Sequence, residues 1–281
     1  MKIILSLSLI LCISFTFPSN EEGSDYAFYY EVEFSADSLN PEDKSKDLMV
    51  LFTVNGKSRY QSYYGFQRDS LTEIAKAQRM DVNEVIPFVN QIQKPQFSYV
   101  IIKDWNKDRY KYVDRVYPDY LIFEDQLAKI EWTIKNEFDE HMGFKTQKAI
   151  TSYGGRDYEA WFAEEIPIND GPYIFGNLPG LIVKLRDTRN HYNFKFTKVE
   201  KKSVNVDYVT HRKTITTTKS QFHKAQHDFN ANVVGRMAMG GVTLNDKSQA
   251  KDVQERYNKK NNQLELDVLC EVICNIPYNS Y

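Results

Sequence analysis

The chain has 281 residues, enough for one large domain or two small ones, and its 42% hydrophobic share is ordinary for a soluble domain. A formal net charge of −2, without long runs of like charge, gives no case for nucleic-acid binding. The aromatic share of 14%, with 19 Tyr and 17 Phe, favours β-structure because aromatic side chains suit pleated, half-buried surfaces.

The N-terminus has the pattern of a secretory signal peptide. Lys2 supplies a positive charge, and Ile3–Phe17 is almost wholly apolar but shorter than the ~20 residues of a membrane-spanning helix. The leucine before Cys12 does not match the small residue that a lipidation site needs. We therefore expect a signal peptide over residues 1–19 and one domain over 20–281. The mature protein is then exported, to the periplasm, the outer membrane or the medium, with no integral membrane segment.

The first predicted elements are strands. Tyr26–Phe34 alternates as a strand with one buried face does. After a polar loop over 37–47, Asn55-Gly56 predicts a hairpin that joins Leu48–Val54 to Lys57–Tyr64.

Helical periodicity follows between residues 68 and 93. Ser70 and Glu73 match a capping box at the start of one helix. Asp81 and Glu84 start a second short helix, which Pro87 ends or kinks. Three further strands are predicted at Phe97–Lys103, Arg109–Tyr117 and Tyr120–Glu124.

The second half of the chain is again rich in strands. Gly154-Gly155 predicts a hairpin, and short turns between the strands favour antiparallel pairing. A helix begins at Ser220 and ends at Gly240-Gly241, and a surface helix is predicted over Ser248–Leu266. The predicted strands lie at Lys148–Tyr153, Asp157–Ala163, Leu181–Leu185, Tyr192–Phe196 and Tyr208–Thr218.

A turn and a buried strand form the most distinctive motif, Asn177-Leu178-Pro179-Gly180-Leu181-Ile182. Pro179 and Gly180 suit the second and third positions of a type II turn, and Asn177 tolerates a left-handed backbone. With GRDYEAWF at Gly155–Phe162 and EIPINDGPYIF at Glu165–Phe175, this motif resembles the GLPGLI family of Bacteroidetes-type bacteria. The resemblance covers about residues 132–199 and implies an exported envelope protein, but no particular activity. Thr146 stands where that family commonly has Cys.

The predicted fold class is a β-rich α+β domain. We expect one large, curved antiparallel sheet, similar to a half-barrel, with two or three helices covering one face. Cys270 and Cys274 are candidates for a disulfide, since cleavage would leave only these two cysteines in an oxidising compartment. An extended strand would place their Cα atoms ~13 Å apart, so bonding requires a helical turn or a tight loop. Free thiols and a functional pair remain alternatives.

His223 and His227 are weak candidates for metal ligands, because two imidazoles four residues apart on a helix can share a metal ion. The apolar stripe of that helix runs through Phe222 and Phe229, which places both histidines on its flank, mostly facing water. No third ligand stands nearby in the sequence. We therefore expect two solvated histidines, with no metal and no other cofactor.

The motif block also carries carboxylates and large aromatic residues. The carboxylates are better explained by outward strand positions and turns than by general acid–base catalysis. The aromatic group suits a packed core or a concave apolar surface for a ligand. The carboxylates are Asp157, Glu159, Glu164, Glu165, Asp170 and Asp187, and the candidate ligand-binding residues are Trp161, Tyr173, Phe175 and Leu178.

Three functions remain open from the sequence. We favour a non-catalytic envelope protein that binds or carries an apolar ligand or an envelope partner, which predicts a wide apolar groove. A metal-dependent hydrolase or metal-binding protein predicts that His223, His227 and a carboxylate meet. A structural or interaction protein predicts an exposed apolar patch on a flat face.

Overall fold

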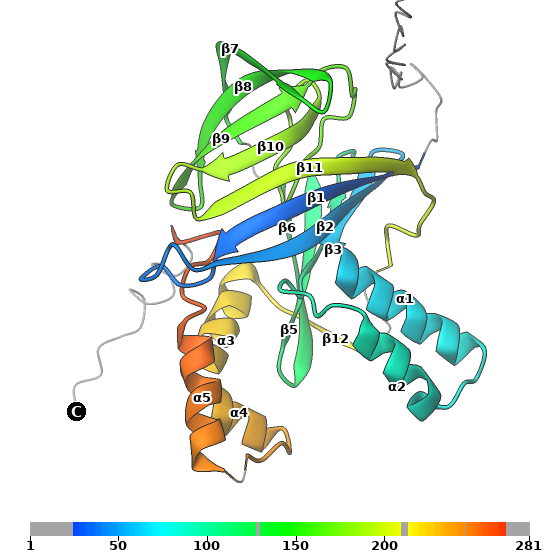
Figure 1. Cartoon of the computed structure of the whole chain (residues 1–281), viewed down its shortest axis with the longest axis vertical. Coiled ribbons are helices and arrows are strands. Elements are labelled where there is room, and N and C mark those ends of the chain that lie inside the picture. The colour runs from blue at the N-terminus through cyan, green and yellow to red at the C-terminus, as the bar shows by residue number, and fades with distance from the viewer. Residues whose placement is uncertain (1–24, 128–129, 209–212, 245, 268–281) are drawn as a thin grey trace, which may run out of the picture.

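The computed structural model describes residues 25–127, 130–208, 213–244 and 246–267. The expected signal peptide, residues 1–19, and the cysteines Cys270 and Cys274 lie outside these ranges. Within them, the strands form a single unclosed 12-stranded sheet (Figure 1). Neighbouring strands are antiparallel except at one edge, where β12 pairs in parallel with β6. The predicted β-rich α+β class with one large sheet is confirmed.

The order of strands in the sheet does not follow the chain. It runs β12-β6-β5-β4-β3-β2-β1-β11-β10-β9-β8-β7, so the first strand lies in the middle of the sheet. The strands are β1 (Tyr26–Ser35), β2 (Lys44–Val54), β3 (Lys57–Ser62), β4 (Val100–Asp104), β5 (Arg109–Val116), β6 (Asp119–Gln126), β7 (Thr133–His141), β8 (Phe144–Tyr153), β9 (Arg156–Ala163), β10 (Leu181–Asp187), β11 (Tyr192–Lys201) and β12 (Thr214–Thr216).

Strand β1 is buried on both faces, whereas its alternation predicted one buried face. Phe28 and Tyr30 enter the main core on what we call the inner face of the sheet. Tyr29 enters a smaller core on the outer face, where its ring meets that of Tyr63 with centroids 5.0 Å apart. The difference arises because a helix covers the outer face, which the alternation of β1 alone does not show.

Helices pack against both faces. On the outer face, α1 (Tyr63–Ala77) packs on β2 and β3, and α2 (Val82–Gln91) packs on α1. On the inner face, three helices follow the last strand, in line with the expected two or three (Figure 1). These are α3 (Lys219–Ala231), α4 (Val233–Met239) and α5 (Lys247–Asn258).

Two helix starts differ from the predicted ones. Helix α1 begins at Tyr63, because the hydroxyl of Ser62 caps it by accepting from the amide of Gly65, so Ser70 lies inside the helix. Helix α3 is capped by Thr218, which forms a capping box with Gln221, instead of by Ser220. In both cases the hydroxyl of a residue earlier in the chain accepts from a backbone amide of the first turn, which has no partner within the helix.

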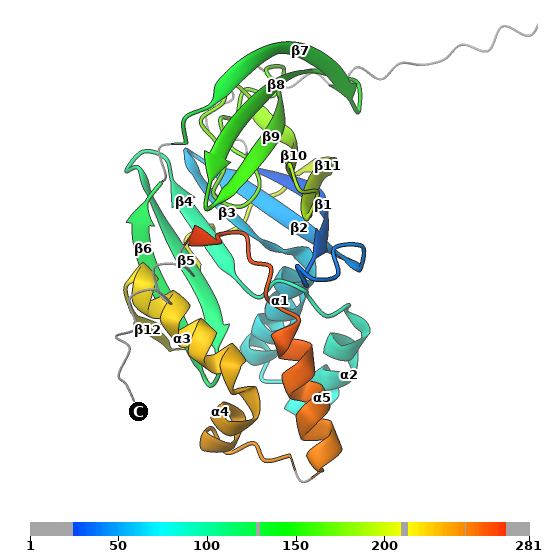
Figure 2. The same cartoon turned by 90° about the vertical axis from the view of Figure 1, so that its left-hand side faces the viewer.

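The C-terminal part departs most from the predictions. The single helix predicted after Ser220 breaks at Asn232 into α3 and α4. The helix predicted to reach Leu266 ends at Asn258, and the chain then runs back along the sheet (Figure 2). We call residues 259–267 the C-terminal segment. Of the strand predicted over Tyr208–Thr218, the described part forms only β12. No helix within the described ranges is long and apolar enough to cross a membrane.

Candidate functional site

The turn at Asn177 to Gly180 directs β10 into the core. Asn177 has a left-handed φ of 62°, and Gly180 has a φ of 152°, well above the ~80° of a type II turn. Gly180 passes so close to β9 that an added Cβ would lie 2.2 Å from the carbonyl oxygen of Ala163. Leu178 and the start of β10, Leu181-Ile182, are fully buried. The motif therefore has a structural place in this fold.

A buried ion pair joins the loop between β9 and β10 to β4. The ammonium of Lys103 bonds the carboxylate of Asp170, and both side chains are almost wholly buried. Asp170 also accepts from the Trp105 indole N–H at 2.8 Å and from the amide of Gly171 at 2.7 Å. Burial lowers the pKa of Lys103, and the charge of Asp170 opposes that shift. Asp170 is thus a buried anchor as well as a turn residue.

A second buried ion pair holds the C-terminal segment. The Arg156 guanidinium lies 3.0 Å from Asp187 Oδ2 and also donates to Asn262 Oδ1 at 2.6 Å. Tyr158 donates to the carbonyl of Leu264 at 3.2 Å, and the amide of Leu266 donates to the carbonyl of Gly154 at 2.7 Å. The GRDY stretch therefore fixes a segment more than a hundred residues later in the chain.

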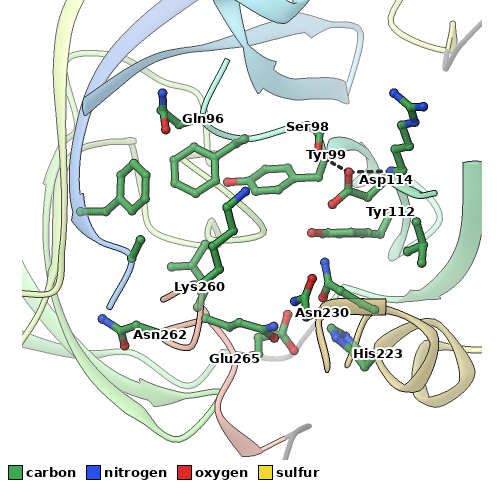
Figure 3. A pocket seen from close by; sticks show the side chains of 18 of the residues that line it. Gln96, Ser98, Tyr99, Tyr112, Asp114, His223, Asn230, Lys260, Asn262 and Glu265 are labelled. Atoms are coloured by element: carbon green, nitrogen blue, oxygen red, sulfur yellow. Dashed lines mark hydrogen bonds between the residues drawn. The ribbon is translucent and has the colours of Figure 1, made fainter. Parts of the chain in front are cut away.

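Between this segment, helix α3 and the sheet lies a cavity of about 260 Å³ (Figure 3). Aromatic side chains from seven separate parts of the chain line it, and polar atoms make up nearly half of its surface. It opens beside exposed residues, among them Ser98 and Arg115. The principal aromatic residues of the wall are Phe34, Phe97, Tyr99, Tyr112, Tyr173 and Tyr192.

Two buried polar side chains that line the cavity lack hydrogen-bond partners among the described residues. They are Tyr99, whose hydroxyl is unpaired, and His223, whose two ring nitrogens are both unpaired. Their residues are 5% and 8% exposed. Burial raises the pKa of Tyr99 well above its usual value and lowers that of His223, so both side chains are neutral near pH 7. Because an unpaired buried polar group costs ~1–3 kcal/mol, these atoms mark a place where a ligand could add hydrogen bonds.

Charged groups complete the cavity. The carboxylate of Asp114 accepts from Ser98 Oγ at 2.6 Å and from the amide of Arg115 at 2.7 Å, and burial raises its pKa to about 6. Lys260 reaches across the cavity toward the ring of Tyr99 (Figure 3). Burial lowers the pKa of Lys260, against the opposing charge of Asp114. Perturbed groups that converge in a concave site indicate a functional site.

The four predicted ligand-binding residues do not form one ligand surface, although the rings of Tyr173 and Phe175 pack together with centroids 6.3 Å apart. Phe175 and Leu178 are fully buried in the core. Trp161 lies on the outer side of β9, where the ammonium of Lys184 stands 4.9 Å from its ring. Of the four, only Tyr173 lines the cavity, and its hydroxyl donates to Glu265 at 2.6 Å.

The two histidines also separate. The expectation that both are solvated is wrong for His223, which is buried because the C-terminal segment packs beside α3. His227 is more exposed and lies 3.7 Å from Asp228. Among the described residues, no three His, Cys, Asp or Glu side chains gather into a metal-binding group.

The carboxylates of the motif block are dispersed in the same way. Asp170 and Asp187 belong to different buried ion pairs. Glu159 pairs with Arg186 on the surface, and Glu165 accepts from the amide of Lys145. These four carboxylates are therefore held by different partners at separate places.

Sequence patterns did not reveal the cavity, since its polar groups come from distant segments. Asp114 and Tyr112 alternate with outward residues of β5 as core residues do. The surface helix predicted over Ser248–Leu266 contained Lys260 and Glu265. Because that helix ends at Asn258, these two residues were not recognised as part of the cavity wall. The nearest available signal was Asp114, a carboxylate at an inward position of a strand.

The unpaired hydroxyl of Tyr99 leads to a prediction about stability. Tyr99→Phe should not lower the melting temperature, because no hydrogen bond to a described residue is lost. Tyr158→Phe, the matched control, should lower it, because it removes the bond to Leu264. Thermal melts of both variants and the parent test this, and equal losses in the two variants would contradict it.

Comparisons with known proteins place the chain only broadly. Residues 122–184 match a family described as "Protein of unknown function (Porph_ging)". This match fits the Bacteroidetes type of protein. It runs from within β6 to within β10 and so includes Asp170 as well as Arg156, which holds the C-terminal segment at the cavity wall. No curated protein matches the sequence.

Two solved structures share the fold. They are structures of PNGF-II in space groups C2 and P21, with TM-scores of 0.51 and 0.52 and 15% identity. Each match covers 73% of this chain but 33% of the other, so the chain spans about a third of the length of those structures. At this identity the likeness shows the fold alone.

Proposed function

We propose that the protein is an exported cell-envelope protein of the GLPGLI type that binds a small, ring-bearing ligand in the cavity beside α3. The proposal refines the apolar ligand expected from the sequence, because the cavity combines aromatic walls with a few convergent polar groups. Such a combination is typical of small-molecule sites. The observation that carries the proposal is the pair of buried, unpartnered side chains, Tyr99 and His223, at one cavity.

The size of the cavity supports a ligand of modest dimensions. An apolar cavity of ~150 Å³ is enough to bind benzene. The cavity beside α3, of about 260 Å³, holds such a ring and several further atoms. Binding would bury the ring against Phe34 and Phe97, whose own rings are 4.5 Å apart. Nothing in this arrangement requires a chemical step, so binding alone is proposed.

A cavity-filling variant tests the proposal. Small ring-bearing compounds should bind the parent protein in ligand-observed NMR. Ala36→Phe places a ring at the cavity wall and should abolish that binding. Ala77→Phe introduces the same ring at the exposed end of α1 and should leave binding intact. Binding that survives in Ala36→Phe, or no binding to the folded parent, would overturn the proposal.

A further inference from the structure

We propose that the ligand of this cavity carries a carboxylate in addition to its ring, and that Lys260 binds this carboxylate. The inference rests on the proposed binding function and adds the chemical class of the ligand. It is based on an imbalance between the cations and the carboxylates that line the cavity: the carboxylates already have partners, whereas the cations do not.

The two carboxylates are occupied by the protein itself. Asp114 accepts from Ser98 and from the amide of Arg115. Glu265 accepts from Tyr173 and lies 2.7 Å from the ammonium of Lys219. A cationic ligand would therefore have to compete with existing partners at Glu265 and at Oδ1 of Asp114, which leaves it only Oδ2 of Asp114.

The cations at the opening are not occupied in this way. Lys260 makes no ion pair with any described residue, and its ammonium lies over the ring of Tyr257, 4.6 Å from the centroid. Arg115 likewise has a ring, that of Tyr117, instead of a carboxylate beside its guanidinium. Burial lowers the pKa of Lys260 and the charge of Asp114 opposes that shift, so the ammonium is partly dehydrated at the cavity, although the residue reaches solvent and bonds no anion. A ligand carboxylate would supply that anion through a charge-assisted hydrogen bond.

The unpartnered neutral groups can also serve a carboxylate. Tyr99 keeps its hydroxyl proton because burial raises its pKa, so the hydroxyl can donate to an anion. The neutral imidazole of His223 has one N–H to donate. With the Lys260 ammonium, the cavity thus offers three kinds of donor. A carboxylate is an acceptor only, and it can accept from several donors at once.

Asp114 makes binding of an anion depend on pH. Its carboxyl is neutral below pH about 6 and charged above, so it repels a ligand anion only at higher pH. Affinity for the anion should therefore fall as the pH rises through that value. The other titratable or charged groups that line the cavity are Tyr99, Tyr112, Arg115, Tyr173, Tyr192, His223, Tyr257, Lys260 and Glu265. Among them, protonation of His223 would act in the same direction, so a variant must separate the two.

Three matched probes test the ligand class. 3-Phenylpropanoate, 3-phenylpropanamide and 3-phenylpropylammonium share one ring and differ in charge. Titration of the folded protein at about pH 5.5 should show the carboxylate binding about tenfold more tightly than the amide, with the ammonium weakest. Equal binding of carboxylate and amide, or tighter binding of the ammonium, would overturn the ligand class and leave the binding function standing. Failure of all three to bind would count against the binding function itself.

Two variants assign the effect to residues. Lys260→Met keeps the length of the side chain and should make the carboxylate and the amide bind equally. Asp114→Asn keeps an oxygen for Ser98 and Arg115, and it should remove most of the loss of carboxylate binding between about pH 5.5 and 7.5. If Lys260→Met still prefers the carboxylate, the assignment to Lys260 is wrong. If Asp114→Asn keeps the parent's full pH dependence, the role of Asp114 is wrong and His223 becomes its source.

Discussion

Gly180→Ala should destabilise the protein by about 3 kcal/mol, because two costs add at this residue. Its φ of 152° lies in a region that residues with a Cβ rarely adopt, at a cost of ~1–2 kcal/mol. The new Cβ would also lie 2.2 Å from the Ala163 carbonyl oxygen, so β9 or β10 must shift, which costs a further ~1–3 kcal/mol. Urea denaturation of the parent and the variant measures the sum.

Two neighbouring substitutions serve as controls. Pro179→Ala mainly frees the unfolded chain and should cost only about 0.4–1 kcal/mol. Asn177→Gly should be neutral or slightly stabilising, since glycine adopts the left-handed φ of 62° without strain. If all three variants unfold at the same urea concentration as the parent, the turn has little structural importance and backbone strain at Gly180 does not limit stability.

Asp170→Ala should cost about 3–5 kcal/mol, because it leaves the Lys103 ammonium buried without its carboxylate. The indole N–H of Trp105 would lose its acceptor as well. Lys103→Met alone leaves a buried carboxylate and should also be strongly destabilising. The double variant Lys103→Met/Asp170→Ala removes both charges. It should therefore lose much less stability than the sum of the losses in the two single variants.

A surface pair provides the comparison for this result. Lys184 and Asp139 form the same type of bond in an exposed position. Asp139→Ala should leave the denaturation midpoint close to that of the parent, because water and salt replace an exposed partner. Similar losses in Asp139→Ala and Asp170→Ala would show that burial is not the source of the effect.

The strands were the most predictable part of the fold. Asn55-Gly56 adopts the positive φ angles of 48° and 74° that its hairpin requires, and the alternating run at Tyr26 is a strand as expected. The exposed strand β7 was largely missed. Its sequence, Thr133–His141, is mostly polar and lies at a sheet edge, so no buried face imposes a pattern on it.

The candidate site was far less predictable than the strands. Each of its groups depends on which distant segments meet. The periodicity of its own helix predicted that His223 faces water, but the side chain is buried beside residues that follow α5. Phe175 and Leu178 were interpreted as a possible ligand surface, but other core side chains, among them Tyr158 beside Phe175, bury them. Local periodicity shows which face of an element is apolar, and it does not show which other element will cover a polar flank.

The central place of β1 has a consequence for how the chain folds. One edge of β1 pairs with β2, the next strand in the chain. The other edge pairs with β11, which begins only at Tyr192. If the chain is exported, as proposed above, and crosses the membrane unfolded, that edge stays unpaired until β11 has also crossed. Pairing across such a separation in sequence gives slow folding, and an open apolar edge favours aggregation. We therefore expect refolding yields that fall steeply with protein concentration, and a need for a chaperone that covers β1 until β11 arrives.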